Sequence, residues 1–348
     1  TARVYETSAR AWESRRGAEG VDQARVFAAG IEAGVLRADL GCGPGFHAEV
    51  LGHPLFALDV APSMLQLVRQ RARDALMVCA ALEQLPFRDG ALGGAWAAKS
   101  YLHVARLATP LALARLHWAL MVDAPVGIRV RQGAAEGLLA SDDFPGRFFC
   151  EWEPEQLEPL LVGAGLVVDS ITLDGRWIDV RARRARSLPD TVGPGMRLLV
   201  CGLNPSLYAA DAGVGFARRG NRFWPAAVAA GLVTHERDPL DALTQHGIGM
   251  TDLVKRATPR ADALRAAEYR AGAARVDDLV RWLQPSAICF VGLAGWRVAV
   301  DRSAKAGVQP EPFGGVPAYV MPSTSGVNTH SGLDDLVTHL RAAAALAG

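Results

Sequence analysis

The sequence lacks several features that would assign it to a simple class. Its cysteines are odd in number and show no paired spacing, at Cys42, Cys79, Cys150, Cys201 and Cys289. This pattern argues against a disulfide framework and against a zinc site. No apolar run approaches the ~20 residues that a membrane-spanning helix needs, and the N-terminus has no charged-then-apolar signal pattern. We therefore expect a soluble, cytoplasmic protein with no metal and no membrane partner.

An excess of charge of one sign is also missing. The 348 residues include 37 basic and 36 acidic side chains, and only three of the basic ones are lysine. Overall charge therefore cannot hold the protein on nucleic acid, and any DNA contact must come from a local patch. Half of the residues are hydrophobic, which is enough to build two cores in a chain of this length.

A segment rich in arginine, proline and glycine, "RARRARSLPDTVGPG" at 181–195, divides the chain. We expect few core contacts to cross it. On both sides strand-like runs alternate with Ala-rich helical patterns, which favours parallel sheets covered by helices on both faces. The prediction is an α/β protein with two three-layer α/β/α domains, over residues 1–186 and 196–348. The expected strands are 35–41, 54–60, 76–82, 93–99, 124–130, a hairpin over 166–184, and then 196–203, 247–254, 286–293 and 317–322.

In the first half, "ADLGCGPG" places Asp39 at the end of a strand, and three glycines follow it at Gly41, Gly43 and Gly45. Glycines let the backbone turn tightly and approach a bulky ligand. Asp59 ends the next strand, where a carboxylate can accept both hydroxyls of a ribose. The alternative for either aspartate is a cap of a helix or turn. The glycine fingerprint of dinucleotide-binding folds would need a glycine at position 46, but this chain has Phe46 there, so the fingerprint is incomplete.

This spacing resembles motif I of the class I S-adenosylmethionine-dependent methyltransferases. The resemblance extends to "LDVAPSML", "LEQLPFRDGALGGAW", "YLHV" and the hairpin, over roughly residues 1–185. It implies a Rossmann-like fold, S-adenosylmethionine as cofactor and a methyl acceptor that the sequence does not name. The implied cofactor contacts are Asp39, Gly41, Cys42, Gly43, Gly45 and Asp59.

The first half departs from that family at two positions. Ala81 and Gly93 stand where the family carries acidic residues, so either adenine binding is weakened or the contact to adenine passes to Glu83 or to backbone groups. The alternative is a domain that only packs against, or positions, its partner domain.

In the second half, a strand ends at the pair Asn204–Pro205. Asparagine can hold a water through its acceptor oxygen and aim it, although it is no strong base. Such a residue suits hydrolysis of a pyrimidine N-glycosidic bond, whose transition state is oxocarbenium-like. Phe216 would offer a face for the base, and such stacking is worth roughly 1–3 kcal/mol. The alternative for Asn204 is an ordinary turn residue.

These residues resemble the mismatch-specific uracil-DNA glycosylases, the family that includes thymine-DNA glycosylase, over roughly residues 195–345. Four segments occur in the family's order: "GLNPS", "GFARRGNRFW", "GMTDLVKRAT" and "MPSTSGVNTH". The resemblance implies a uracil-DNA-glycosylase fold and, as partner, double-stranded DNA with a mismatched or damaged pyrimidine. It also implies that Asn204 positions the water, and that the flipped base lies against Gly202, Leu203, Phe216 and Asn221.

The resemblance further implies which residues contact DNA. Ser323 and Ser325 approach the backbone, while Gly326, Val327 and Asn328 form a wedge that fills the gap left by the flipped nucleotide. Flipping costs a few kcal/mol and is least costly at a mismatch. Basic side chains that could meet phosphates are Arg218, Arg219, Arg222, Lys255 and Arg256. The alternative for these five is ordinary solvated charge, and for residues 221–224 it is capping and packing.

Asp252 has two interpretations. It could take a proton from water or stabilise the sugar cation, or it could be the N-cap of a helix over "LVKR". The last segment begins Met321-Pro322-Ser323, so no histidine is placed to stabilise a departing uracil anion, and His330 is expected on the surface. This predicts slow turnover and a broad choice of base. Two rival functions stay open: a methyltransferase whose second half only binds nucleic acid, and a damage binder that flips a base without cutting.

Overall fold

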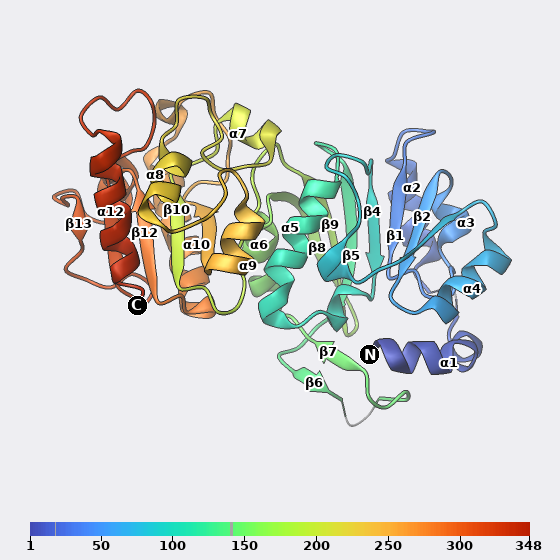
Figure 1. Cartoon of the computed structure of the whole chain (residues 1–348). Helices are drawn as coiled ribbons and strands as arrows, with labels where there is room; N and C mark the ends of the chain where they lie inside the picture. The colour runs from blue at the N-terminus through green and yellow to red at the C-terminus, as the bar shows by residue number, and fades with distance from the viewer. Residues whose placement is uncertain (18, 140–141) are drawn as a thin grey trace. The chain divides into compact units, whose positions relative to one another are not determined.

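The computed structural model describes residues 1–17, 19–139 and 142–348, and the chain forms two compact units, Thr1–Ala185 and Arg186–Gly348 (Figure 1). Each unit is built on a mainly parallel sheet with helices on both faces, which confirms the predicted pair of α/β folds. In the described part of the chain, no helix is long and apolar enough to span a membrane.

The sheet of the first unit has the order β3-β2-β1-β4-β5-β9-β8. The first five strands are parallel, whereas β9 runs antiparallel to both of its neighbours. The strands are β1 (Arg37–Leu40), β2 (Leu55–Asp59), β3 (Leu76–Cys79), β4 (Ala95–Ala98), β5 (Pro125–Arg131), β8 (Leu166–Asp174) and β9 (Trp177–Arg184). All of them lie within the predicted ranges, give or take one residue. A small hairpin of β6 (Glu136–Leu138) and β7 (Phe148–Cys150) was not predicted.

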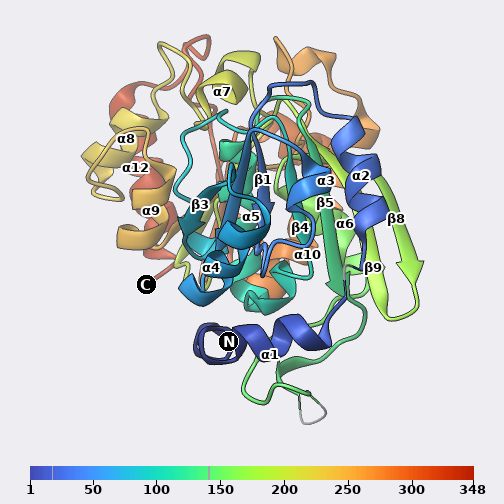
Figure 2. The ribbon, with the colours of Figure 1, turned by 90° about the vertical axis from the view of Figure 1, so that its right-hand side faces the viewer.

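The described residues of this unit form the α-helices α1 (Ala2–Arg15), α2 (Val21–Ala29), α3 (Ala48–Leu51), α4 (Pro62–Arg71), α5 (Thr109–Ala119) and α6 (Pro154–Gly163). Helices α2, α3 and α4 pack in one hydrophobic cluster with β2, while α5 and α6 contact each other and cover the other face. Helix α1 lies across the carboxyl ends of the parallel strands (Figure 2). Ligands in such sheets bind beyond these ends, so α1 is placed to cover a binding site.

The sheet of the second unit has the order β11-β10-β12-β14-β13. Its four parallel strands, which match the predictions, are β10 (Leu198–Gly202), β11 (Ile248–Asp252), β12 (Ala287–Val291) and β14 (Ala318–Met321). They are buried along their whole length, as expected for a parallel sheet covered on both faces. The short antiparallel edge strand β13 (Gly307–Val308) was not predicted.

The helices of the second unit are α7 (Leu207–Ala212), α8 (Phe223–Ala230), α9 (Pro239–His246), α10 (Ala266–Leu283), α11 (Leu293–Ala299) and α12 (Leu333–Ala345). Helices α8 and α12 pack together in the core on one face, and α10 contacts α11 on the other. The loop before α12 and helix α7 lie at the same edge of this sheet (Figure 1). This edge carries the carboxyl ends of the parallel strands.

The segment 181–195 contains the division between the two units, which falls between Ala185 and Arg186, so the second unit begins ten residues earlier than the predicted residue 196. Residues 181–184 belong to β9, and residues 187–193 are buried within the second unit. Thr191 forms an antiparallel bridge with Met250 of β11, with two backbone hydrogen bonds of 2.9 Å. The segment therefore extends the edge of the second sheet instead of crossing solvent, and it brings Asp190 into the core.

Candidate functional sites

The carboxyl ends of β10 and β11 bring two predicted catalytic side chains to one place. Gly202 and Asp252 are the last residues of these neighbouring parallel strands, and they are partners in register. The backbone continues the pairing, because Leu253 donates to Gly202 O and Val254 donates to Leu203 O. Asn204 follows at once, and Ser206 then caps α7 by accepting from the Ala209 N–H at 3.1 Å. The Asn-Pro-Ser sequence is thus a strand exit followed by a helix start.

The carboxamide of Asn204 is fixed in one orientation. Its Nδ2 lies 3.1 Å from Pro205 O, 3.0 Å from Arg256 O and 2.8 Å from Thr258 Oγ1. Thr258 Oγ1 donates its own proton to Arg260 O, so it acts as an acceptor toward Asn204. Three acceptors can be satisfied only by the NH₂ end of the amide. The acceptor oxygen Oδ1 is left without a hydrogen-bond partner among the described residues, and Asn204 is half-buried, not turned into the core.

Asp252 is a buried carboxylic acid, and no helix begins at it. Its main chain is the last residue of β11, so the N-cap interpretation is wrong. The residue is 9% exposed, and within the described chain its carboxylate has neither an ion pair nor a hydrogen bond. Burial raises the pKa of Asp252 to about 6, with Lys255 and Arg275 opposing the rise and Asp190 adding to it. An acid with this pKa changes its charge near neutral pH, which suits proton transfer.

Phe216 and Gly202 define the wall beside Asp252. A Cβ on Gly202 would lie 2.5 Å from Asp252 Oδ1 and 3.2 Å from Phe216 Cζ, so these three residues are in close contact. Phe216 has a positive φ of 57°, a conformation that costs of order 1 kcal/mol for a non-glycine residue. One face of its ring stacks on Phe223, with centroids 4.2 Å apart. Leu203 Cδ1 packs toward Gly295 of α11.

Residues 221–224 cap and pack the loop, which was the alternative to a direct role in base or DNA binding. Asn221 Oδ1 accepts from the Phe223 N–H at 2.9 Å and so caps the start of α8. Phe223 and Trp224 are each 1% exposed, and Trp224 Nε1 donates to Gly215 O at 2.9 Å. Asn221 therefore holds the loop that carries Phe216, and its side-chain oxygen is already engaged.

The loop of residues 323–331 is held by hydrogen bonds between its own residues and by hydrogen bonds from Arg222. Asn328 Nδ2 donates to Ser323 O at 2.7 Å, and Ser323 Oγ accepts from the Ser325 N–H at 3.2 Å. Arg222 donates to the carbonyls of Ser325, Asn328 and Ser331. This closed arrangement leaves Val327 at the tip.

The tip of this loop is apolar and backed by glycine. Val327 is 84% exposed, more than any other large hydrophobic side chain in the described chain. Gly326 packs on the backbone of Gly220, where a Cβ would come within 2.8 Å of Gly220 O. An exposed apolar residue on a supported loop has the form of the predicted wedge.

The five basic candidates divide into two groups. Arg218 and Arg219 are exposed. Lys255 is engaged in a buried ion pair: its Nζ lies 2.8 Å from Asp190 Oδ1, and its side chain is only 9% exposed. Arg222 donates its hydrogen bonds to carbonyls of the loop of residues 323–331. Arg256 forms two hydrogen bonds to Glu268, at 2.7 and 2.9 Å. The sequence did not show the acidic partners because Asp190 and Glu268 lie far from these cations in the chain.

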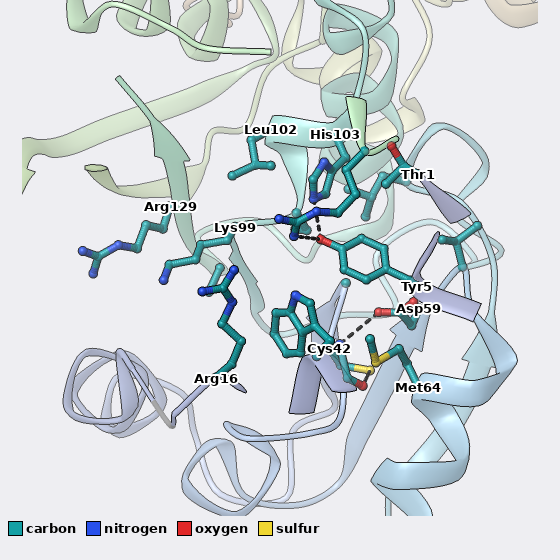
Figure 3. Close-up of a pocket in the computed structure, with 18 of the residues that line it drawn as sticks. Thr1, Tyr5, Arg16, Cys42, Asp59, Met64, Lys99, Leu102, His103 and Arg129 are labelled. Carbon is teal, nitrogen blue, oxygen red and sulfur yellow. Dashed lines mark hydrogen bonds between the residues drawn. The ribbon is translucent and has the colours of Figure 1, made fainter. Parts of the chain in front are cut away.

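The first unit contains a cavity of about 730 Å³ at the carboxyl ends of β1, β2 and β4 (Figure 3). Of the predicted cofactor contacts, five line this cavity: Gly41, Cys42, Gly43, Asp59 and Glu83. Gly41 is required there by a positive φ of 72° and by Ser100, whose Cβ would lie 2.4 Å from a Cβ at this position. The glycine turn therefore lets the strand exit approach the end of β4.

Asp59 points its carboxylate at the glycine turn. One oxygen accepts from the Gly43 N–H and the other from the Ala61 N–H, each at 2.9 Å. Burial raises the pKa of Asp59, and the two backbone N–H groups oppose the rise. Each oxygen keeps lone pairs for a further donor, so the carboxylate can hold the turn and a ligand hydroxyl together.

Two predicted cofactor contacts do not line the cavity. Asp39 is 1% exposed, and burial raises its pKa to about 8, with Asp59 adding to the rise. Among the described residues its Oδ2 has no hydrogen-bond partner. Gly45 faces α4, where its Cβ would lie 3.2 Å from Val68 Cγ2. The lining of the cavity includes neither Asp39 nor Gly45.

Many cavity residues were not predicted, and three of them, Ala2, Tyr5 and Trp12, come from α1. Tyr5 and Trp12 lie one heptad apart on α1, and both line the cavity. This spacing was the signal that the sequence offered, because residues at i and i+7 share one face of a helix. Arg147 also lines the cavity, and nothing in its local sequence marks it.

Tyr5, His103 and Arg147 form a connected group whose proton positions follow from geometry (Figure 3). His103 Nδ1 lies 2.6 Å from Phe148 O, a pure acceptor, so Nδ1 carries the proton. His103 Nε2 then accepts from the Tyr5 hydroxyl at 2.7 Å, and Arg147 donates to the same hydroxyl at 3.1 Å. Burial lowers the pKa of His103 to about 4, which keeps the imidazole neutral.

The described residues contain no group of three or more histidine, cysteine, aspartate or glutamate side chains placed to hold a metal ion. The four buried cysteines are free thiols, and burial raises the pKa of Cys42 and of Cys201 well above its ordinary value. Cys79, at the end of β3, is exposed, and Cys42 lines the cavity.

The two sheets and their strand-end residues correspond to two known classes of domain. Residues 189–345 match the model of the uracil DNA glycosylase superfamily, and residues 38–117 match the model of a methyltransferase domain. The chain therefore carries a uracil-DNA glycosylase superfamily domain and a methyltransferase domain. The superfamily is broader than the mismatch-specific branch that the motifs predict.

Solved structures similar to the chain include three methyltransferases. The 1,6-didemethyltoxoflavin-N1-methyltransferase of Burkholderia thailandensis is 20% identical, with a TM-score of 0.43, over 52% of this chain and 84% of that one. The CcbJ methyltransferase of Streptomyces caelestis is 15% identical, with a TM-score of 0.44, over 52% and 98%. An S-adenosylmethionine-dependent methyltransferase of Mesorhizobium loti is 16% identical, with a TM-score of 0.40, over 48% and 100%.

Proposed function

We propose that the protein is a DNA repair glycosylase that hydrolyses the N-glycosidic bond of uracil in mismatched DNA, with thymine and modified pyrimidines as further substrates. It is fused to an S-adenosylmethionine-dependent methyltransferase-like domain. One observation carries the proposal: Asn204 presents only its acceptor oxygen, because its NH₂ group faces Pro205 O, Arg256 O and Thr258 Oγ1. The uracil DNA glycosylase superfamily match over residues 189–345 supports the same class of reaction.

In the proposed reaction, Asn204 Oδ1 accepts a hydrogen bond from a water and aims the water oxygen at C1′ of the flipped nucleotide. The C1′–O bond forms while the C1′–N1 bond breaks, and the electron pair of that bond leaves with the base. Ionised Asp252 takes the proton from the attacking water. The base anion gains a proton from solvent, and Asp252 returns its proton to solvent. The products are a free base and an abasic sugar.

The pKa of about 6 at Asp252 gives this reaction a pH dependence. The ionised carboxylate is the proton acceptor, so the rate should rise with pH through about 6 and then level off. No histidine is placed at Met321-Pro322-Ser323 to stabilise the departing anion. Slow turnover and tolerance of several bases are expected for this reason.

The experiment is single-turnover incubation with G:U, G:T and A:U duplexes, followed by alkaline cleavage at abasic sites. Asn204→Ala should lose at least about 100-fold of the excision rate, a magnitude typical of removing one preorganised polar group. Binding to the same duplex, measured by gel shift, should persist in this variant. If the wild-type protein leaves all three duplexes intact at every enzyme excess, glycosylase activity is rejected. Persistent binding would then favour a damage binder.

A second candidate activity is methyl transfer, and the cavity in the first unit favours it. The residues fit a nucleoside cofactor: Asp59 retains free lone pairs at the wall, and Glu83 lies nearby. Two buried polar atoms that line the cavity, Trp12 Nε1 and Ser100 Oγ, have no hydrogen-bond partner in the described chain. Bound S-adenosylmethionine would supply an electrophilic methyl group. Asp59 would hold its ribose, and α1 would exclude water.

Two substitutions separate the activities. Asp59→Ala should abolish binding of S-adenosylmethionine in a calorimetric titration and leave uracil excision unchanged. Asn204→Ala should do the reverse. If the wild-type protein binds the cofactor but releases no base, the methyltransferase whose second half only binds nucleic acid becomes the better account.

A further inference from the structure

A buried group of four hydrogen-bonded side chains contacts the main chain of Asp252. Its members are Asp190, Thr251, Lys255 and Arg275. Asp190 Oδ1 accepts from Thr251 Oγ1 at 2.6 Å and from Lys255 Nζ at 2.8 Å, and its Oδ2 accepts from Arg275 Nη1 at 2.6 Å. Arg275 Nη2 also donates to Thr251 Oγ1 at 3.1 Å and to Asp252 O at 2.7 Å. Arg275 on α10 therefore joins the carboxylate of Asp190 to the main chain of Asp252.

These charges are almost completely excluded from solvent. The exposed fraction of the side chain is 5% for Asp190, 9% for Lys255 and 11% for Arg275. Burial would raise the pKa of Asp190, but Arg275 and Lys255 outweigh it and hold this pKa below its ordinary value. Two cations and one anion leave a net charge of +1. Ionised Asp252 is the group that balances it.

The charged groups acting on Asp252 come from three different elements. Asp190 lies in the segment before β10, Lys255 follows β11, and Arg275 lies on α10. On β10, the neighbouring Cys201 is a neutral thiol because burial raises its pKa well above the ordinary value. Phe216 and Gly202 add no charge. The balance between Asp190 and the two cations therefore decides how readily Asp252 ionises.

Asp39 in the first unit serves as an internal comparison. It is also a carboxylic acid in a buried parallel strand, but no cation contributes to its ionisation, and its pKa is raised to about 8. At Asp252, where Lys255 and Arg275 oppose the effect of burial, the pKa is raised only to about 6. The difference has the sign expected for nearby positive charge, which favours the ionised form of an acid.

We propose that Asp190, held between Lys255 and Arg275, is a positioning residue that sets the charge of Asp252 and fixes the end of β11 beside Asn204. The catalytic meaning of this arrangement rests on the proposed glycosylase function, whereas the ionisation of Asp252 does not. Without Asp190 the two cations would face Asp252 alone and would hold it ionised. Without Lys255 the remaining pair of Asp190 and Arg275 would be neutral, and Asp252 would ionise less readily.

The test is a titration of the Asp252 carboxyl carbon by ¹³C NMR in the full-length protein, with the signal assigned by its loss in Asp252→Asn. Asp190→Asn should lower the pKa of Asp252 by roughly 1 or more, and Lys255→Met should raise it by a similar amount, because each change alters one neighbouring charge. Lys305→Met is the matched control. It removes an exposed lysine and should leave the titration unchanged.

Opposite shifts in the two variants support the proposal, and a purely structural role would not produce them. Unchanged values, or shifts in the same direction, overturn it. If Asp190→Asn does not fold, Lys255→Met decides alone, because it retains the pair between Asp190 and Arg275. The excision rate of each variant is then measured against pH, and its midpoint should follow the pKa. A shifted titration in a protein that releases no base would reject the glycosylase function and leave this inference standing.

Discussion

Gly202 and Asp252 face each other across β10 and β11 so closely that a methyl group on the glycine would lie 2.5 Å from Asp252 Oδ1. The two residues are 50 positions apart in sequence, yet they are register partners at the ends of neighbouring parallel strands. The absence of a side chain at Gly202 is what allows the carboxylate of Asp252 to lie beside Phe216.

Gly202→Ala should therefore damage the site. Overfilling a packed region costs typically ~1–3 kcal/mol, and here the carboxylate of Asp252 must move. A displacement of this kind lowers catalysis by about 100-fold, measured as single-turnover release of uracil from a G:U duplex. Gly193→Ala is the control, because its added methyl would meet only Leu243 Cδ2 at 3.8 Å, an ordinary contact. Equal rates for both variants would contradict the close packing of Asp252.

Thr258 should act through the orientation of Asn204. Thr258→Val keeps the shape but removes the oxygen that accepts from Asn204 Nδ2 at 2.8 Å. The variant also loses the hydrogen bond from Thr258 Oγ1 to Arg260 O. Loss of the bond to Asn204 predicts a kcat roughly 3- to 10-fold lower with little change in KM. Thr244→Val removes a comparable hydrogen bond, from Thr244 Oγ1 to Leu240 O, on the exposed side of α9, and should have no kinetic effect. The idea fails if the two variants have the same kcat.

Val327 should contribute to excision from duplex DNA but not to excision from single-stranded DNA. Val327→Ser changes a side chain that is 84% exposed, so the free energy of unfolding should change by less than ~0.5 kcal/mol. Excision from a duplex should fall by up to roughly 10-fold, because the wedge offsets part of an unstacking cost of a few kcal/mol. Excision from single-stranded DNA should not fall. Val308→Ser, at a residue 59% exposed on the edge strand, is the control, and identical losses in both variants would remove the case for a wedge.

Arg218 and Arg219 should contribute to phosphate contacts. The logarithm of the binding constant falls with the logarithm of salt concentration by ~0.9 for each phosphate neutralised. The double variant Arg218→Ala/Arg219→Ala should therefore reduce this slope by about 2. Arg256→Ala is the comparison, because Arg256 already forms hydrogen bonds to Glu268. An unchanged slope in the double variant would place both arginines away from DNA.

The buried acid Asp39 should make the first unit less stable as the pH rises. Burial raises its folded pKa to about 8 from an ordinary value of 3.8. The folded state therefore binds more protons than the unfolded state between these values, and the free energy of unfolding should fall as pH rises from about 4 to about 8. Hydrogen exchange of β1 peptides in the full-length protein measures this. Asp39→Asn cannot ionise and should flatten the dependence. If the free energy of unfolding of Asp39→Asn fell equally steeply with pH, a group other than Asp39 would be responsible for the pH dependence.

Much of the molecule follows from local patterns in the chain. The strand ranges held because a parallel strand covered on both faces needs a short, continuous apolar run. The glycine turn at 41–43 and the Asn204–Pro205 exit were also predictable, since both depend on backbone preferences of adjacent residues. Asp59 was placed correctly at the end of its strand. Asp252 was predicted inside the strand range 247–254 or as a helix N-cap, whereas it ends β11 opposite Gly202.

The partners of charged and polar side chains were not predictable in this way. Lys255 was expected to contact DNA, but it forms an ion pair with Asp190, which lies 65 positions earlier in the chain. The segment 181–195 was expected to have few core contacts because of its composition, but residues 187–193 are buried. Its burial depends on pairing with β11. Asp39 and Asp59 have the same residue type and local setting, yet one lies inside the sheet and the other lines the cavity.

The sequence by itself determined the elements, their order and the residues at the strand ends, because periodicity and turn chemistry act over a few neighbouring positions. Only the tertiary structure decided which of these residues carry a free charge, which atom of Asn204 is available and how Asp252 ionises. The physical reason is that hydrogen bonds, burial and Coulomb interactions depend on distances in space, and these distances are set by which distant segments pack side by side.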